Sequence, residues 1–129
     1  MRIYDYTDSL YQTYELALER RNLHEELSMV SVNELQTSNN KEKFRNSEKR
    51  LQSYLERLDI KTLEVIRAVL YIGIDYFNDT EECISNPSSE IEKAIGHYHD
   101  DKDTTISIIC GKMILDQYLK KGFEVLRIE

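Results

Sequence analysis

The chain has 129 residues, of which 40% are hydrophobic and 32% are charged, a composition typical of one globular domain with a core of its own. Only four glycines and one proline occur, which argues against a multi-stranded β architecture and favours long helices. The net charge of −7, without a basic stripe, argues against a nucleic-acid partner and against binding to an anionic membrane surface.

The N-terminal half has the pattern of two long helices. Residues 1–7 form a lead-in without the apolar run of a signal peptide, so we expect a cytoplasmic protein. From residue 8 to about 36 nothing interrupts a helical pattern. The polar stretch 37–41, TSNNK, has the composition of a turn, and a second apolar stripe then continues to residue 58. Residues 8–58 therefore predict an antiparallel helical hairpin.

The first of these helices carries more apolar side chains than one face holds. Leu10, Tyr14 and Leu18 lie on one side, and further apolar residues drift to another. The drifting residues are Leu23, Leu27 and Val30. The second helix covers only one face, so the other needs a cover from the C-terminal part of the chain, a different protein or a second copy. Because two-fold homodimers are the commonest oligomers, we predict a homodimer with these residues at its interface.

The stretch 58–77, LDIKTLEVIRAVLYIGIDYF, is the most apolar window of the chain and predicts the central helix. Its apolar residues occupy most of the helix circumference, which places it in the middle of the domain. Asp59 is a plausible N-cap for it. The charges within the stretch argue against a membrane span, because each costs roughly 2.5–3.5 kcal/mol near a bilayer centre.

One narrow polar stripe runs along this central helix. Its members are Glu64, Arg67, Tyr71 and Asp75, whose spacings of three, four and four place them on one face. The functional hypothesis is a small polar site on an otherwise buried helix. The simpler hypothesis is a solvent-facing stripe with a Glu–Arg pair.

The remainder of the chain predicts shorter helices. A polar loop at 78–89 holds the only proline, and Ser88 or Ser89 is expected to cap a helix that runs to residue 98. A second break at 99–103 ends with Asp103 as the expected next cap. The β-branched run 104–110 is compatible with a strand, but no partner strand is evident, so we predict a helix. The last helix is expected over 112–126.

Residues with chemical potential form no recognisable site. His97, His99, Asp100 and Asp101 lie within five residues, but histidines two apart diverge on a helix. Cys83 and Cys110 belong to no CxxC pair, and we expect both thiols to be reduced. No glycine-rich phosphate loop or nucleophile elbow occurs. We therefore expect no metal and no cofactor.

The C-terminal half contains two segments with a resemblance. LYIGIDYF at 70–77 and IICGKMILDQYLKKGFEVL at 108–126 are similar to MYIGRD and LIGKPLLGDYLEEGL, which characterise a bacterial domain family of unknown function. The shared positions are Gly73, Gly111, Tyr118 and Gly122. The chain differs at Ile74, where the family has arginine, and at Lys120 and Lys121, where the family tends to acids. The resemblance covers residues 58–126, implies an all-helical fold and implies no activity.

We predict an all-α fold of about six helices in a single domain, 1–129, with a hairpin (8–58) followed by a compact helical bundle (59–126). Nine acids and two bases between residues 75 and 103 give that segment a net charge of −7, so the rest of the chain is neutral overall. The expected function is a non-enzymatic protein–protein interaction or regulatory module. The alternative is a small-molecule or metal-dependent enzyme that uses the polar stripe.

Overall fold

The computed structural model describes residues 3–28, 34–78 and 86–128. Within these ranges the chain forms six α-helices and one short 3-10 helix, with no strand, so the predicted all-α fold is confirmed. The elements in order are η1 (Ile3–Tyr6), α1 (Thr7–Ser28), α2 (Glu34–Glu56), α3 (Ile60–Asp75), α4 (Pro87–His97), α5 (Lys102–Cys110) and α6 (Leu115–Leu126).

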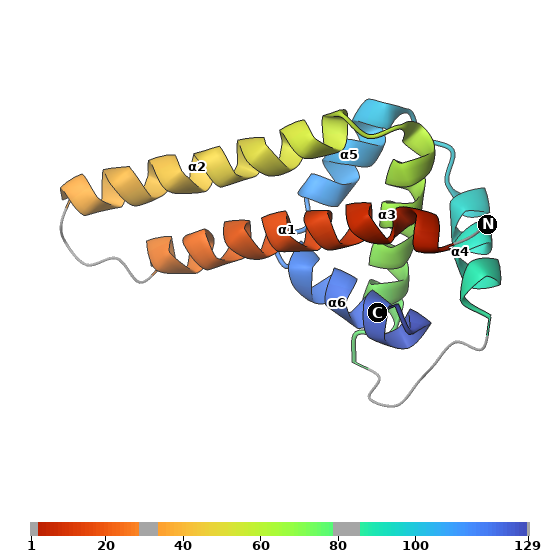
Figure 1. The fold of residues 1–129 in the computed structure, drawn as a ribbon. Coiled ribbons are helices and arrows are strands. Elements are labelled where there is room, and N and C mark those ends of the chain that lie inside the picture. Colours follow the sequence, from red (N-terminus) through yellow and green to blue (C-terminus); the bar gives the residue numbers. More distant parts are fainter. Residues whose placement is uncertain (1–2, 29–33, 79–85, 129) are drawn as a thin grey trace.

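Two parts are visible in Figure 1. Helices α1 and α2 lie side by side as a long hairpin, and α3 to α6 form a bundle around one end of it. The distal half of the hairpin extends away from the bundle. This arrangement of a helical pair followed by a packed bundle is the one that the sequence predicts.

Helix α3 is the centre of the bundle. Every residue from Val65 to Leu70 is buried, and α4, α5 and α6 all pack on this helix. Burial of each large aliphatic side chain stabilises the fold by about 1.5–3 kcal/mol. Asp59 caps the helix as predicted, accepting a hydrogen bond from the Thr62 amide at 2.9 Å.

The contact between α3 and α6 is a close approach of two backbones. A methyl group added at Gly73 would lie 1.8 Å from the carbonyl oxygen of Tyr118, and one added at Gly122 would lie 2.6 Å from that of Val69. Real carbon atoms do not come so close to carbonyl oxygens. Each of the two helices therefore needs a glycine where it faces the other.

The hairpin is seated on the bundle through the first half of α1. Leu10 and Ala17 are fully buried there. The rings of Tyr11 and Tyr14 lie edge-on to Phe123 of α6, with centroids 5.1 and 5.9 Å apart. Aromatic pairs of this geometry contribute about 0.5–1.5 kcal/mol beyond the area they bury.

The predicted turn at 37–41 is wrong, because these residues lie within α2. The intrinsic helix penalty of Thr, Ser and Asn is at most about 0.7 kcal/mol per residue relative to alanine. Tertiary packing exceeds such a penalty, and Asn40 is buried in the hairpin. Helix α1 ends at Ser28 and α2 begins at Glu34, and residues 29–33 lie outside the described ranges.

Two predicted helix caps are also wrong, by two or three residues. Asn86, rather than Ser88 or Ser89, caps α4 and accepts from the Ser89 amide. Asp101, rather than Asp103, caps α5 and accepts from the Thr104 amide at 2.7 Å. Pro87 fixes the start of α4, because proline is favoured in the first turn where its missing N–H costs nothing. The helical assignment of 104–110 is confirmed.

We predict that Gly73→Ala lowers the free energy of unfolding by about 3 kcal/mol or more, because the new methyl group forces α3 and α6 apart. The matched control is Gly96→Ala in α4, where nothing lies within 4 Å of the added carbon. That variant should gain about 0.5–1 kcal/mol from improved helix propensity. Chemical denaturation followed by circular dichroism measures both, and a Gly73→Ala variant as stable as the parent would contradict the close packing.

Candidate functional site

The predicted polar stripe does not face water as a unit. Arg67 is buried, with a relative exposure of 1%, whereas Glu64 and Tyr71 are half-buried and Asp75 is exposed. The four side chains follow one face of α3 as their spacing predicts, but they pass from the packed part of the helix to its exposed C-terminal end. Arg67 and Tyr71 both lie beside Tyr98, in the connection between α4 and α5.

Arg67 attaches the connection between α4 and α5 to the central helix. Its Nη1 donates to Asp100 Oδ2 at 2.7 Å, and its Nη2 donates to the Tyr98 carbonyl oxygen at 3.0 Å. The guanidinium also lies 5.2 Å from the centroid of the Tyr98 ring. The ionic partner of Arg67 is therefore Asp100, from a segment about 30 residues away, rather than Glu64. The spacing of residues along α3 cannot indicate a partner that is so distant in the sequence.

Tyr71 completes this cluster and keeps its proton at neutral pH. Its ring centroid lies 4.9 Å from that of Tyr98. Burial raises the pKa of the Tyr71 phenol above its ordinary value, although the nearby Arg67 acts in the opposite direction. A phenol in this state donates a hydrogen bond but is a poor general base.

The candidate metal ligands of the HYHDD sequence serve other purposes or point to solvent. His97 and His99 are exposed. Asp100 is engaged by Arg67, and Asp101 caps α5, where the Thr104 amide holds the pKa of the Asp101 carboxyl below its usual range. Among the residues that the structure describes, no group of three or more His, Cys, Asp or Glu side chains is placed to hold a metal ion.

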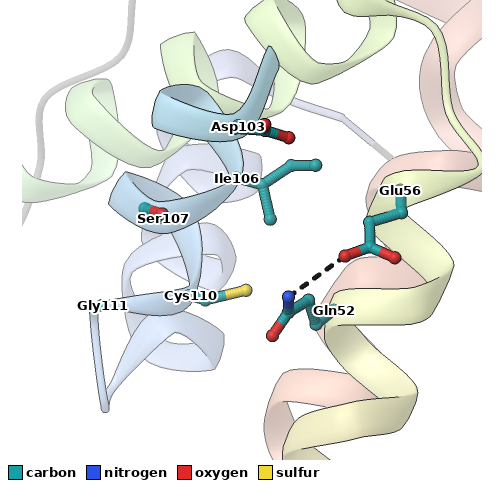
Figure 2. A pocket seen from close by; sticks show the side chains of 7 residues that line it. All are labelled: Gln52, Glu56, Asp103, Ile106, Ser107, Cys110 and Gly111. Atoms are coloured by element: carbon teal, nitrogen blue, oxygen red, sulfur yellow. Dashed lines mark hydrogen bonds between the residues drawn. The ribbon is translucent and has the colours of Figure 1, made fainter.

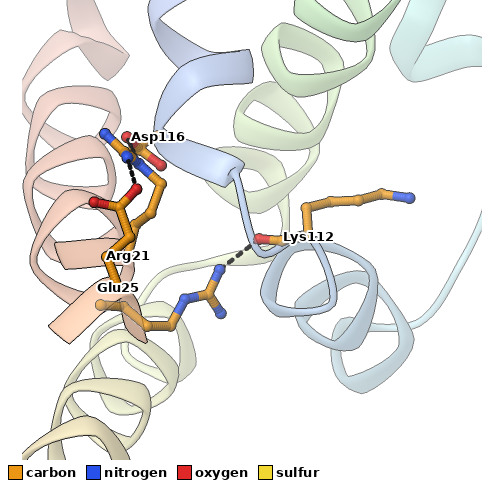
Figure 3. Close-up of polar contacts among 5 residues, drawn as sticks. Arg21, Glu25, Lys112 and Asp116 are labelled. Carbon is orange, nitrogen blue, oxygen red and sulfur yellow. Dashed lines mark hydrogen bonds and ion pairs between the residues drawn. The ribbon is translucent and has the colours of Figure 1, made fainter. Parts of the chain in front are cut away.

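A second buried polar cluster, which the sequence analysis missed, joins α1 to the connection between α5 and α6. Arg20 is 2% exposed and donates to the backbone carbonyls of Cys110, at 2.7 Å, and Lys112. Its neighbour Arg21 donates through Nε to Asp116 Oδ2 at 2.7 Å and through Nη1 to Glu25. Figure 3 shows Arg21, Glu25 and Asp116 at this junction. The two arginines therefore attach the middle of α1 to the segment that runs from the end of α5 into α6.

The surface between α2 and α5 holds a hollow of about 380 Å³. Figure 2 shows the Cys110 sulfur on one side of it and the carboxylate of Glu56, hydrogen-bonded to Gln52 at 3.1 Å, on the other. Burial raises the pKa of the Cys110 thiol, and Glu48 and Glu56 act in the same direction against Arg20. The thiol is therefore a poor nucleophile at neutral pH. Cys83 lies outside the described residues.

A surface groove of about 450 Å³ is lined by residues of both α1 and α2 in the half of the hairpin nearer the bundle. Its lining includes three cations, Lys49, Arg50 and Arg57, and no carboxylate. The other lining residues divide into hydrogen-bonding side chains and an apolar wall formed by Leu16 and Tyr54. We call this hollow the α1–α2 groove. No local sequence pattern indicates this groove, because the grouping of its residues depends on how the two helices are paired.

The predicted interface residues lie in the distal half of the hairpin. Leu23 and Leu27 are half-buried on α1, and Val30 lies outside the described residues. The rings of His24 and Phe44 are 5.5 Å apart and connect α1 to α2 in this region. Both leucines therefore keep part of their apolar surface accessible on a segment that extends away from the bundle (Figure 1).

No protein-family model matches the chain, and neither a curated protein nor a solved structure is significantly similar to it. Across residues 3–28, 34–78 and 86–128, no helix has the length and apolar character needed to cross a membrane.

We predict that Asp100→Asn lowers the free energy of unfolding by about 1–2 kcal/mol, because it removes the ionic partner of a buried guanidinium. The expected loss of stability is smaller than that for a fully buried ion pair, because the Asp100 side chain is 35% exposed. Asp75→Asn is the control on the exposed end of the same stripe and should change stability by less than about 0.5 kcal/mol. Equal losses in both variants by urea denaturation would contradict the structural role of Asp100.

We predict that Cys110 reacts slowly with iodoacetamide at neutral pH. The test uses a Cys83→Ser variant, so that Cys110 is the only thiol. Because the thiolate is the reacting species and burial raises the pKa of Cys110, unfolding the variant in urea should increase the alkylation rate. Mass spectrometry follows the reaction, and a folded-state rate equal to or above the unfolded-state rate would show an activated thiol instead.

Proposed function

We propose that the protein is a non-enzymatic protein-interaction module and that the distal half of the α1–α2 hairpin is its binding element. The observation that supports this function is the partly exposed pair Leu23 and Leu27 on a helix that extends from the bundle. Apolar side chains on a projecting segment bury more surface when a partner covers them. Their contribution is about 25 cal/mol per Å² of apolar surface removed from water.

The partner that we propose is a second copy of the chain. Two identical hairpins can pair about a two-fold axis, so that each one's leucines cover those of the other. The interface would also bring together hairpins from the part of the sequence that is neutral overall, and the segment at 75–103 with its net charge of −7 need not take part. A duplex nucleic acid is not proposed as a partner because of the overall charge.

An enzyme that uses the polar stripe is the competing function, and the contacts of the stripe weigh against it. Both Nη atoms of Arg67 are engaged within the fold, by Asp100 and by the Tyr98 carbonyl. The raised pKa of Tyr71 disfavours its phenolate. A catalytic pair needs groups that are free to exchange protons with a substrate, and these two residues act as structural supports.

The kinship and cellular location of the protein are further parts of the proposal. We propose that residues 58–126 belong to the uncharacterised bacterial helical family that they resemble, and that the protein is cytoplasmic. The support for the kinship is physical: Gly73, Tyr118 and Gly122, three of the shared positions, meet at the contact between α3 and α6. Shared positions of this kind serve the packing of two helices, and they do not indicate an active site.

Size-exclusion chromatography with light scattering tests the self-association. We expect the parent protein to have a mass near twice the 15.3 kDa of one chain, and the Leu23→Glu, Leu27→Glu double variant to be monomeric. Burying the introduced charges without partners would cost more than the interface supplies. The charge-matched control is Asn22→Glu with Asn39→Glu, at two exposed positions of the hairpin, which should remain dimeric. A parent mass of one chain over a wide concentration range would refute the dimer.

A further inference from the structure

Two of the three cations of the α1–α2 groove, Lys49 and Arg57, lie along one line of α2. Lys49, Ser53 and Arg57 follow one another at intervals of four residues, so each cation is about one helical turn, roughly 6 Å, from the serine. All three line the groove. Long side chains one turn to either side can both reach a group that lies above Ser53, whose side chain is exposed.

These two cations are available for a ligand. Among the residues that the structure describes, the ion pairs leave out both Lys49 and Arg57, whereas Arg50 pairs with Glu19 of α1. Arg57 is held in place by other contacts. Its Nε donates to the Ser53 carbonyl oxygen at 3.4 Å, and its guanidinium lies 6.0 Å from the centroid of the Tyr54 ring. The guanidinium is thereby kept beside Ser53 without its charge being neutralised.

The remaining polar groups of the groove add hydrogen-bond donors. Gln12 of α1 and Asn46 of α2 each present a side-chain amide, and Ser53 presents a hydroxyl. A lining of cations, amides and a hydroxyl, without a carboxylate, suits a ligand that accepts many hydrogen bonds and carries negative charge. Phosphate has this chemistry, with about 1.5–2 negative charges in a monoester at neutral pH and three accepting oxygens.

The size and surroundings of the groove favour a small ligand over a polymer. Its volume of about 450 Å³ lies in the range of pockets for small molecules. A long polyanion would also extend over a protein with a net charge of −7. A small ligand responds mainly to nearby charges, because at physiological ionic strength the screening length is about 8 Å. The apolar wall of Leu16 and Tyr54 gives the body of such a ligand a surface to pack on.

We propose that the α1–α2 groove binds a small phosphate ester, with the phosphate above Ser53 between Lys49 and Arg57 and the organic body against Leu16 and Tyr54. This ligand site lies apart from the distal leucines, so it goes beyond the proposed self-association and does not depend on it. Ligand binding is measured by NMR shifts of the residues that line the groove, whereas self-association is measured by the mass of the protein. Either proposal can therefore be refuted without the other.

The test is a titration of isotope-labelled full-length protein with phenyl phosphate, followed by amide NMR at constant ionic strength. We expect saturable shifts in the segments around Gln12 and Ser53, and weaker binding of inorganic phosphate, which lacks the organic body. The Lys49→Gln, Arg57→Gln double variant should bind phenyl phosphate at least about tenfold more weakly. Ser53→Glu, which places a carboxylate where the phosphate would lie, should abolish binding.

The control variant removes the same charge from the same helix. Lys41→Gln with Lys43→Gln changes two exposed lysines of α2 that do not line the groove, and its dissociation constant should stay within about twofold of the parent's. Thermal melting of each variant verifies its fold, which these exposed substitutions should preserve. The proposal is overturned if the parent shows no saturable shift, if the Ser53→Glu variant binds like the parent, or if both double variants lose affinity equally. Equal affinity for phenyl phosphate and inorganic phosphate would overturn the ester assignment.

Discussion

The close backbone contact between α3 and α6 is the constraint on which the other contacts of this fold depend. Gly73 and Gly122 let the two helices meet without intervening side chains, so that α6 packs closely on one side of α3. The other sides of α3 are then free for α4 and α5, and the outer face of α6 receives the tyrosines of α1. Dispersion forces weaken steeply with separation, so a helix pair held further apart would lose part of each of these interfaces.

The buried polar groups of the protein strengthen this arrangement rather than interrupt it. Arg67 and Arg20 are almost fully buried. Arg67 donates to the Tyr98 carbonyl in the connection between α4 and α5, and Arg20 donates to two carbonyls, at the last residue of α5 and just after it. A guanidinium has several donors, so that of Arg20 bonds two carbonyls at once. The buried arginines of the interior thus act as structural supports, whereas Lys49 and Arg57 of α2 are exposed to solvent.

The sequence predicted helices better than it predicted their ends and their neighbours. The central helix was evident because its apolar residues follow a helical period, and Asp59 was recognisable as its N-cap. Around α4 and α5, several Ser, Asn and Asp residues compete within a few positions, and composition does not rank them. The polar stripe was placed on the right helix, yet the burial of Arg67 depends on Asp100 and Tyr98, which only the tertiary fold brings near. The α1–α2 groove likewise requires the register of two helices, which no local pattern encodes.

The seating of α1 beside Arg20 has a mechanical consequence. From the buried Leu51 to its first residue, Glu34, helix α2 is about 25 Å long, so a rotation of about 10° at the base of the hairpin carries its tip about 4 Å. The carbonyls of Cys110 and Lys112 that accept from Arg20 lie where the hairpin joins the bundle. A small adjustment of the segment between α5 and α6 would therefore be magnified at the Glu34 end of α2.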